Sequence, residues 1–289
     1  MKFWQMVPYM EPEQLLDVAR IAEEVGFEGV MGADHLLYPR VLHSPYPYTP
    51  DGESPIDSES PYPDPWVMTA MMAAVTTRLK FSTSIYILPL RHPLEVAKAT
   101  GTLSLLSNGR FILGAGAGWM KEEFDAAGVD FHTRGRRMNE MLEVMPALWS
   151  GDWVDHDGEF FQFDGVRLRP APPSPVPVFI GGSSAPALRR TVKYGSGFIG
   201  HGNHPDEVAP LLRKIRALRD EQGVAEQPFE TVLGLTTPPD YDTFRRLADE
   251  GMTASVNYPF SMILGGGSTL DEKRRVMESF AENFIVKLS

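Results

Sequence analysis

The segment 79–119 constrains the fold most, because it places a strand, a helix and a second strand in an order that few architectures accept. Residues 80–88 are β-branched and apolar, as expected of a buried strand. Helical spacing of apolar and small residues follows over 93–107, and the turn signal Asn108-Gly109 precedes a second apolar run over 111–113. Because parallel strands need a long crossover connection, this order predicts a parallel βαβ unit.

Composition limits the compartment and the partners. The 289 residues include no cysteine and carry a formal net charge of −11. The lack of cysteine excludes disulfides and fits a reducing compartment. No apolar signal core opens the chain, and no apolar run approaches the length of a membrane span. These features predict a cytoplasmic protein with no membrane partner, and the acidic charge argues against nucleic-acid binding.

Eight strand-like runs alternate with helical patterns along the chain. They lie at residues 2–7, 29–33, 80–88, 111–113, 178–180, 197–200, 230–235 and 253–258. The alternation predicts one α/β domain over 1–289, a (β/α)8 TIM barrel, with an open doubly wound sheet as the alternative. In both folds ligands bind beyond the carboxyl ends of the strands, so residues 84–92 and 114–119 should face one site.

Two insertions interrupt this alternation. Residues 36–63, after the second strand, are rich in Pro, Tyr, Ser and Asp, and their aromatic rings favour a packed lid over a disordered loop. Residues 151–177, before the fifth strand, alternate like a β-hairpin around Asp157-Gly158 and continue into a proline-rich connector. Both insertions are expected to wall the substrate site.

Two glycine-rich strand ends are candidate ligand contacts. Residues 114–118 read GAGAG, and Trp119 stands where a dinucleotide fingerprint would need glycine. These glycines either let a planar or phosphorylated ligand approach or form a tight turn. Residues 181–184 read GGSS directly before a helix, whose N-terminus attracts anions. This pattern favours a phosphate site, with plain N-capping as the alternative.

Asp34 and His35 form an Asp-His pair at a strand end, where the histidine is either a general acid or base or a structural residue.

Basic residues after the third and fourth strands would suit an anionic ligand tail, or form a solvated face paired with neighbours such as Glu122 and Glu123. This basic set comprises Arg91, His92, Lys121, Arg134, Arg136 and Arg137. No metal-ligand spacing and no nucleophile motif is found, so neither a metal site nor covalent acyl chemistry is expected.

The chain resembles the bacterial-luciferase-like monooxygenase superfamily and, within it, the F420-dependent oxidoreductases. The matching segments are ADH at 33–35, RHPLEVAKATGTLSLLSNGRFILGAGAGWMKEEFDAAGVDF at 91–131, RGRRMNEMLEVMPALW at 134–149, GEFFQF at 158–163 and PVPVFIGGSSAPALRRTVKYGSGF at 175–198. They make up about a third of the chain and follow the family's order and spacing.

This resemblance implies a barrel that binds coenzyme F420, or alternatively FMN, at the carboxyl ends of its strands. It implies that Ser84 and Ile85 form a third-strand bulge with a non-proline cis peptide behind the cofactor ring. It also implies that Asp34 and His35 lie near that ring. The cofactor-binding residues so implied are Asp34, His35, Ser84, Ile85, Ala117, Gly118, Trp119, Gly181, Gly182 and Ser183.

The sequence therefore predicts an F420-dependent oxidoreductase that transfers a hydride between the deazaflavin and a small apolar substrate, with His35 as the catalytic proton donor or hydrogen-bond partner. The alternatives are an FMN-dependent monooxygenase that uses reduced flavin and oxygen, and a non-catalytic flavin- or deazaflavin-binding protein. In the family's sugar-phosphate dehydrogenases an acidic residue occupies the place of Trp119, so a bulky apolar substrate is expected here. Analogy with relatives predicts a homodimer.

Overall fold

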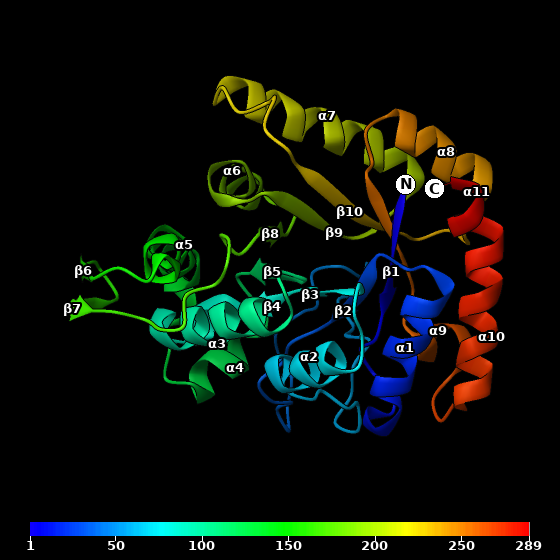
Figure 1. Cartoon of the computed structure of the whole chain (residues 1–289), viewed down its shortest axis with the longest axis horizontal. Coiled ribbons are helices and arrows are strands. Elements are labelled where there is room, and N and C mark those ends of the chain that lie inside the picture. The colour runs from blue at the N-terminus through cyan, green and yellow to red at the C-terminus, as the bar shows by residue number, and fades with distance from the viewer. Residues whose placement is uncertain (289) are drawn as a thin grey trace.

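The computed structural model describes residues 1–288 and shows a closed barrel of parallel strands surrounded by helices (Figure 1). Neighbouring strands follow the order β3-β2-β1-β11-β10-β9-β8-β5-β4, and pairing of Phe81 with Phe111 joins β3 to β5 and closes the sheet. The predicted (β/α)8 barrel is confirmed, and an open sheet is excluded. Ser289, the last residue of the predicted domain, lies outside the described residues.

The elements alternate as the sequence predicts. The barrel strands are β1 (Lys2–Met6), β2 (Gly29–Gly32), β3 (Lys80–Thr83), β4 (Tyr86–Ile87), β5 (Phe111–Gly116), β8 (Val178–Gly181), β9 (Gly197–Asn203), β10 (Glu230–Leu235) and β11 (Ala254–Asn257). The helices are α1 (Leu15–Val25), α2 (Pro65–Ala74), α3 (Pro93–Leu106), α4 (Lys121–Ala126), α5 (Arg134–Ser150), α6 (Ala185–Tyr194), α7 (Pro205–Glu221), α8 (Tyr241–Asp249), α9 (Phe260–Leu264), α10 (Leu270–Phe280) and α11 (Val286–Leu288). Short helical turns are η1 (Pro12–Gln14), η2 (Leu88–Leu90), η3 (Phe131–Thr133) and η4 (Ala281–Ile285). Among residues 1–288, none of the helices has the length and apolarity needed to cross a membrane.

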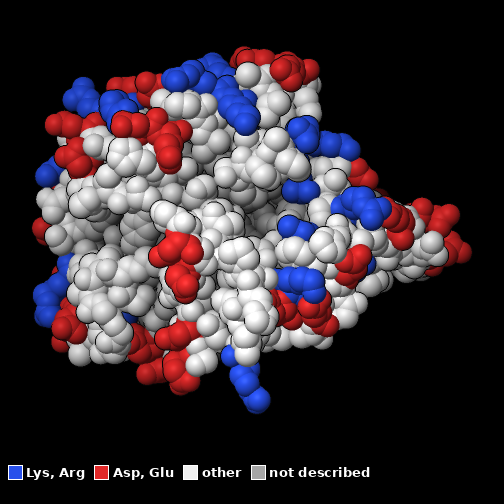
Figure 2. Space-filling model, turned by 180° about the vertical axis from the view of Figure 1, so that it is seen from behind, with Lys and Arg blue, Asp and Glu red and all other residues white. Residues whose placement is uncertain are grey.

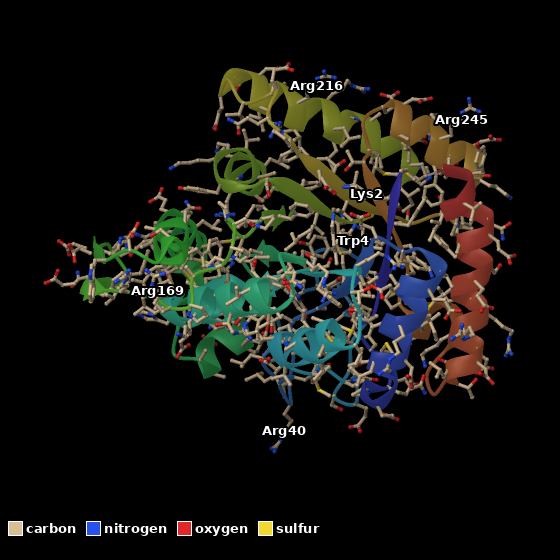
Figure 3. All side chains as sticks on the ribbon, in the orientation of Figure 1. Lys2, Trp4, Arg40, Arg169, Arg216 and Arg245 are labelled. Carbon is tan, nitrogen blue, oxygen red and sulfur yellow. The ribbon has the colours of Figure 1, made fainter. Side chains whose placement is uncertain are left out.

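Large apolar side chains fill the inside of the barrel. One buried cluster comprises Trp4, Met31, Ile112, Phe179, Ile199, Val232 and Ala254, with Trp4 labelled in Figure 3. Two glycines make room for its largest members. A Cβ at Gly29 would lie 2.3 Å from the Trp4 ring, and one at Gly197 would lie 2.4 Å from the Phe179 ring. Because the centre is packed, space for a ligand lies at the strand ends, as in other barrels of this type.

The third barrel strand differs from the continuous run predicted over 80–88. The peptide bond between Ser84 and Ile85 is cis, and it separates β3 from the two-residue strand β4. The chain then turns into η2 instead of continuing as a strand. The non-proline cis peptide that the family resemblance implies is therefore present at the expected bond.

Two short helices have no counterpart among the elements that the sequence predicts. Helix α4 follows Trp119, and α9 precedes the glycine-rich residues 265–267. They contain six and five residues, respectively, which is too short for helical periodicity to show in a sequence. Strand β5 also extends to Gly116, three residues beyond the predicted end of its apolar run.

The two insertions differ in structure. Residues 36–63, the lid, contain neither helix nor strand. Residues 151–177, the hairpin insertion, contain the antiparallel strands β6 (Val154–Asp157) and β7 (Gln162–Val166). Figure 1 shows these two strands beyond α5, at the left edge of the molecule.

Candidate active site

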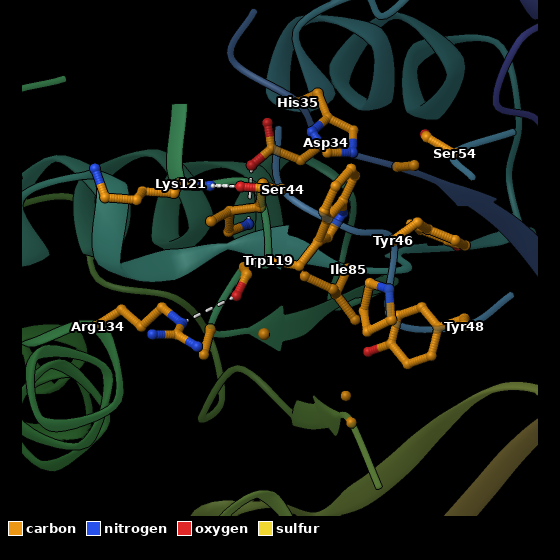
Figure 4. A pocket seen from close by; sticks show the side chains of 18 of the residues that line it. Asp34, His35, Ser44, Tyr46, Tyr48, Ser54, Ile85, Trp119, Lys121 and Arg134 are labelled. Carbon is orange, nitrogen blue, oxygen red and sulfur yellow. Dashed lines mark hydrogen bonds between the residues drawn. The ribbon is translucent and has the colours of Figure 1, made fainter. Parts of the chain in front are cut away.

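A cavity of about 950 Å³ opens at the carboxyl ends of the barrel strands. Figure 4 shows that its side chains come from several elements, including the lid and the start of α4. All ten residues implied to bind the cofactor line it: Asp34, His35, Ser84, Ile85, Ala117, Gly118, Trp119, Gly181, Gly182 and Ser183. The fold thus brings the sequence-predicted site residues together around one space. Among residues 1–288, no group of three or more His, Asp or Glu is placed to hold a metal ion.

Ile85 lies between two glycine-rich strand ends. A Cβ at Gly116 would lie 2.4 Å from Ile85 Cδ1, and a Cβ at Gly181 would lie 2.6 Å from Ile85 Cγ2. Gly118 adopts a φ of +79°, which side chains rarely accept. Gly116 and Gly181 therefore admit a side chain of the protein itself, and Gly118 lies in the turn after β5. Ile85 in turn presents an apolar surface to the cavity.

The α6 end of the cavity favours an anion. Gly182 has a φ of +102°, and Ser184 caps the helix, accepting a hydrogen bond from Ala187 N–H at 3.4 Å. Both serines of the GGSS segment line the cavity next to the first turn of α6. Unpaired N–H groups at a helix N-terminus and two hydroxyl groups form a suitable phosphate cradle.

Two arginines line the cavity near this cradle, Arg134 from α5 and Arg190 from α6. Arg134 Nε donates to the Gly118 carbonyl at 3.2 Å (Figure 4), and Arg190 Nε donates to Asn139 Oδ1 at 2.8 Å. Burial lowers the pKa of both guanidinium groups. Both guanidinium groups nevertheless remain charged at physiological pH. Within the described part of the chain, neither arginine forms an ion pair. On the face of the molecule opposite to the view of Figure 1, Figure 2 shows basic side chains beside a hollow.

The predicted basic set does not converge on one ligand. Its ion pairs are Arg91–Asp34, Lys121–Asp125 and Arg136–Glu159. His92 instead caps α3, and Arg137 packs on the rings of Phe160 and Phe161. Of the two alternatives that the sequence left open, these contacts favour a face paired with acidic neighbours over one anion-binding cluster. Arg134 is the member of the set that lines the cavity without an ion pair among residues 1–288.

Asp34 lies in the cavity wall with both carboxylate oxygens engaged. Oδ2 accepts from Arg91 Nη1 at 2.6 Å and from the Ile87 N–H at 2.9 Å, and Oδ1 accepts from Arg91 Nη2 at 2.8 Å. Only 4% of Asp34 is exposed. The Asp34–Arg91 pair therefore ties the end of β2 to β4, next to the cis bond before Ile85.

His35 lies near the lid, held by rings and by a carboxylate. Its ring is edge-on to Tyr62 and Trp119, with centroid distances of 5.1 and 5.8 Å. Its Nδ1 is 3.0 Å from Oε2 of Glu123, the third residue of α4, whose Oε1 accepts from Leu36 N–H at 2.6 Å. Sequence reasoning missed this contact and treated Glu123 as a neighbour of the basic residues, because nothing local signals a partner 88 residues away.

The lid covers the cavity with aromatic rings. Tyr46 lies edge-on to Trp119 at 5.2 Å, and Tyr48 stacks on His201 at 4.5 Å. Burial raises the pKa of Tyr46 and Tyr48, so their hydroxyl groups stay neutral. The rings that the lid adds to the cavity are therefore uncharged, in contrast to the side that carries the two arginines.

Glu122 holds the lid to α4. It accepts from His43 N–H at 2.8 Å, from Ser44 N–H at 3.1 Å and from Ser44 Oγ at 2.7 Å. Ser44 Oγ also accepts from Lys121 N–H at 3.0 Å, as Figure 4 shows. Although burial alone would raise its pKa, these hydrogen bonds lower the pKa of Glu122 to about 2.

The hairpin insertion lies away from the cavity. No cavity-lining residue comes from 151–177 in the part of the chain that the structure describes, so the predicted second wall is wrong. The hairpin instead packs on α5 through Glu140. This carboxylate accepts from the N–H groups of Phe160 and Phe161, both at 2.9 Å, and contacts His156 Nε2 at 3.0 Å.

Comparisons with known proteins relate this fold and site to one family. Residues 2–242 match the luciferase-like monooxygenases. An uncharacterized protein of Mycobacterium tuberculosis is 36% identical over 278 residues, covering 94% of this chain and 95% of that protein. The F420-dependent glucose-6-phosphate dehydrogenase of Nakamurella multipartita is 30% identical over 252 residues, covering 85% of this chain and 69% of that enzyme.

A solved structure shows the same fold. The monooxygenase RslO1 from Streptomyces bottropensis superposes with a TM-score of 0.79 at 19% identity, with 100% of each chain covered. The family match extends over most of the chain, and it includes the strand ends, the lid and α4, which build the cavity. The chain therefore belongs to the luciferase-like monooxygenase family.

Proposed function

We propose that the cavity binds coenzyme F420 and that the chain is an F420-dependent oxidoreductase. When bound, this cofactor would supply hydride transfer at its deazaflavin ring. The observation that carries the proposal is that three kinds of surface line the same cavity. The apolar surface of Ile85 suits a ring, Gly182 and Ser183 at the start of α6 suit a phosphate, and Arg134 and Arg190 suit further negative charge.

The other predicted residues would take the following places around the cofactor. Ser84 precedes Ile85 at the cis bond, which would lie behind the ring, and Gly181 meets Ile85 from β8. Ala117 and Gly118 would border the ring from the end of β5. His35 would hold or move a proton at Nε2 on the side covered by the lid.

The choice of F420 over FMN rests on charge. FMN carries one phosphate, whereas F420 carries a phosphodiester and a polyanionic tail. Two guanidinium groups that form no ion pair within residues 1–288 favour the more anionic ligand. The relative from Nakamurella multipartita, which is named F420-dependent, agrees with this choice. An FMN-dependent monooxygenase is the second candidate, favoured by the shared fold of the monooxygenase RslO1.

We further propose a small apolar substrate. Trp119 and Tyr46 present aromatic surface beside His35, and the tyrosine hydroxyl groups of the lid are neutral. A sugar phosphate, the substrate class in the name of the 30% identical relative, would need polar or charged groups where this chain has Trp119. An apolar molecule with one polar atom toward His35 fits this surface better.

Titration of the purified protein with F420 and with FMN, followed by fluorescence, tests the cofactor. F420 is expected to bind at least about tenfold more tightly, a difference of about 1.4 kcal/mol. Micromolar FMN binding with no F420 binding would overturn the proposal and favour the monooxygenase.

Arg134→Met should weaken F420 binding about tenfold. Its matched control on the same helix is Arg136→Met, which should bind F420 normally because Arg136 pairs with Glu159 outside the cavity.

We also propose that the chain forms a homodimer through α2. The outward face of this helix consists of Val67, Ala70, Met71 and Ala74, which are all exposed. Exposed surface on a helix that is apolar on every side indicates a partner. Because Leu106, at the end of the neighbouring α3, is also 73% exposed, the apolar surface continues onto a second helix.

The dimer is tested by measuring the solution mass of the protein. The wild type is expected at twice the mass of one chain, and Met71→Glu at the mass of a monomer. Met262→Glu is the control, because Met262 is equally exposed (54%, against 53% for Met71) but lies on α9. A monomeric wild type would contradict this proposal without affecting the cofactor proposal.

A further inference from the structure

Glu123 is a buried carboxylate whose position needs explanation. It is 0% exposed and forms no ion pair with a lysine or arginine in the described part of the chain. Burying a charged group without a partner is costly, so its hydrogen bonds must offset the lost hydration. Those hydrogen bonds serve two consecutive residues, His35 through Oε2 and Leu36, the first residue of the lid, through Oε1.

The two carboxylate oxygens of Glu123 have fixed roles. Oε1 accepts from the Leu36 backbone N–H at 2.6 Å, and a backbone N–H can only donate. The side chain is therefore anchored, with Oε2 3.0 Å from His35 Nδ1. Because an ionised carboxylate can only accept, a proton on Nδ1 is needed to complete this hydrogen bond.

The other nitrogen of the imidazole remains available. Nε2 of His35 has no hydrogen bond within residues 1–288, and the ring lines the cavity. Tyr62 and Trp119 pack edge-on against the ring at interplanar angles of 90° and 82° and limit its rotation. Tyr62 from the lid, together with Trp119 and Glu123 from one segment after β5, thus fixes the orientation of the imidazole.

We infer that Glu123 is a positioning residue, which keeps the proton of the neutral His35 ring on Nδ1 and leaves Nε2 bare toward the cavity. A neutral His35 then accepts a hydrogen bond at Nε2, and a protonated ring donates one from the same atom. The tautomer is set by the hydrogen bond at the opposite nitrogen. The use of Nε2 in turnover rests on the proposed function, but the tautomer itself does not.

The substitution Glu123→Gln has a definite expected effect. The amide oxygen is needed by Leu36 N–H, which places the amide NH₂ group opposite His35 Nδ1. An NH₂ group donates, so Nδ1 must become the acceptor and the ring proton must move to Nε2. The variant should therefore invert the tautomer of His35 without removing the ring from the cavity.

Nitrogen-15 NMR of the imidazole rings in the cofactor-free protein tests this inference. Spectra are recorded at about pH 8.5, two units above the ordinary histidine pKa of about 6.5. The His35 signals are assigned by their loss in His35→Gln. In the wild type, Nδ1 is expected at the chemical shift of a protonated nitrogen and Nε2 at that of a bare one. A proton on Nε2, alone or together with one on Nδ1, would overturn the inference.

Glu140 provides the matched control. Its carboxylate contacts His156 Nε2 at 3.0 Å and accepts from two backbone N–H groups, in the same manner but outside the cavity. Glu140→Gln should change the His156 signals and leave those of His35 in place, whereas Glu123→Gln should exchange the two His35 shifts. If both variants leave His35 unchanged, Glu123 does not set the tautomer. If Glu123→Gln does not fold, the wild-type spectrum alone decides.

This experiment is separate from the test of the cofactor. The spectra need neither F420 nor a substrate, so the tautomer can be correct even if F420 does not bind. Conversely, tight F420 binding with a bare Nδ1 in the wild type would support the proposed function and overturn the role of Glu123.

Discussion

In both the lid and the hairpin insertion, a helix glutamate accepts hydrogen bonds from two consecutive backbone N–H groups and ties the segment to the body of the protein. Glu122 on α4 accepts hydrogen bonds from residues 43–44 of the lid, and Glu140 on α5 accepts from residues 160–161 of the hairpin insertion. The lid lines the cavity and the hairpin insertion does not. The same kind of contact thus holds a cavity-lining segment in the lid and a segment outside the cavity in the hairpin insertion.

The two glutamates differ in burial. Glu140 is 8% exposed, and it lies so close under the hairpin turn that a Cβ at Gly158 would be 2.0 Å from its Oε1. Glu122 is partly exposed and holds a segment without regular secondary structure. Loss of a buried acceptor leaves N–H groups without water, whereas solvent can replace an exposed one. The hairpin contact should therefore matter for stability, and the lid contact for local opening.

Glu140→Ala should have the largest effect. It leaves two buried or half-buried backbone N–H groups without an acceptor, and it should lower the free energy of unfolding by about 2–4 kcal/mol. Denaturant unfolding measures this loss, and the proposed binding of F420 should stay unchanged. Glu143→Ala on the same helix is the control, because its exposed contact with Lys193 should contribute less than about 0.5 kcal/mol. Loss of F420 affinity in folded Glu140→Ala would show that the hairpin insertion also shapes the cavity.

Glu122→Ala should have a smaller effect on stability and a local effect on the lid. Removing this partly exposed acceptor should cost about 1 kcal/mol, which raises the open population of the lid about fivefold. Hydrogen exchange of residues 36–63, followed by mass spectrometry, should accelerate by that factor. In Glu140→Ala, exchange of the lid should stay at the wild-type rate. An unchanged lid in Glu122→Ala would mean that the aromatic contacts of Tyr46 and Tyr48 hold it without the glutamate.

The sequence was sufficient for features with a local signature. Alternating apolar runs predicted the eight barrel strands, and the alternation around Asp157-Gly158 predicted the hairpin. The cis bond at Ser84–Ile85 was predicted only through the family resemblance, since no propensity rule singles out that peptide bond. These features depend on residues close in the chain, or on a pattern shared with relatives.

Contacts between distant residues were not predictable in this way. Asp34 meets Arg91 across 57 residues, and Glu123 meets His35 across 88. Charge alone suggested that Arg91 faces a ligand, but a single sequence does not show which carboxylate lies nearer. Arg190 was not predicted to line the cavity, because it lies inside a helix and far along the chain from the predicted basic set. Strand order brings these groups together, and their pairing follows only from the closed barrel.

The pH dependence of the contact between Glu122 and the lid is the smallest expected effect. It separates the contribution of the Glu122 charge from that of ring packing in the lid. The folded-state pKa of Glu122 is about 2, whereas an unfolded glutamate titrates near 4.3. Because the folded value is lower, the carboxylate adds stability that is complete above about pH 5 and is lost as the pH falls from 4.3 toward 2. Urea unfolding of the wild type and of Glu122→Gln should therefore show a constant difference between pH 5 and 7 that shrinks toward pH 3. A difference that stays constant down to pH 3 would mean that the lid is held by packing of its rings, and that the charge of Glu122 contributes little.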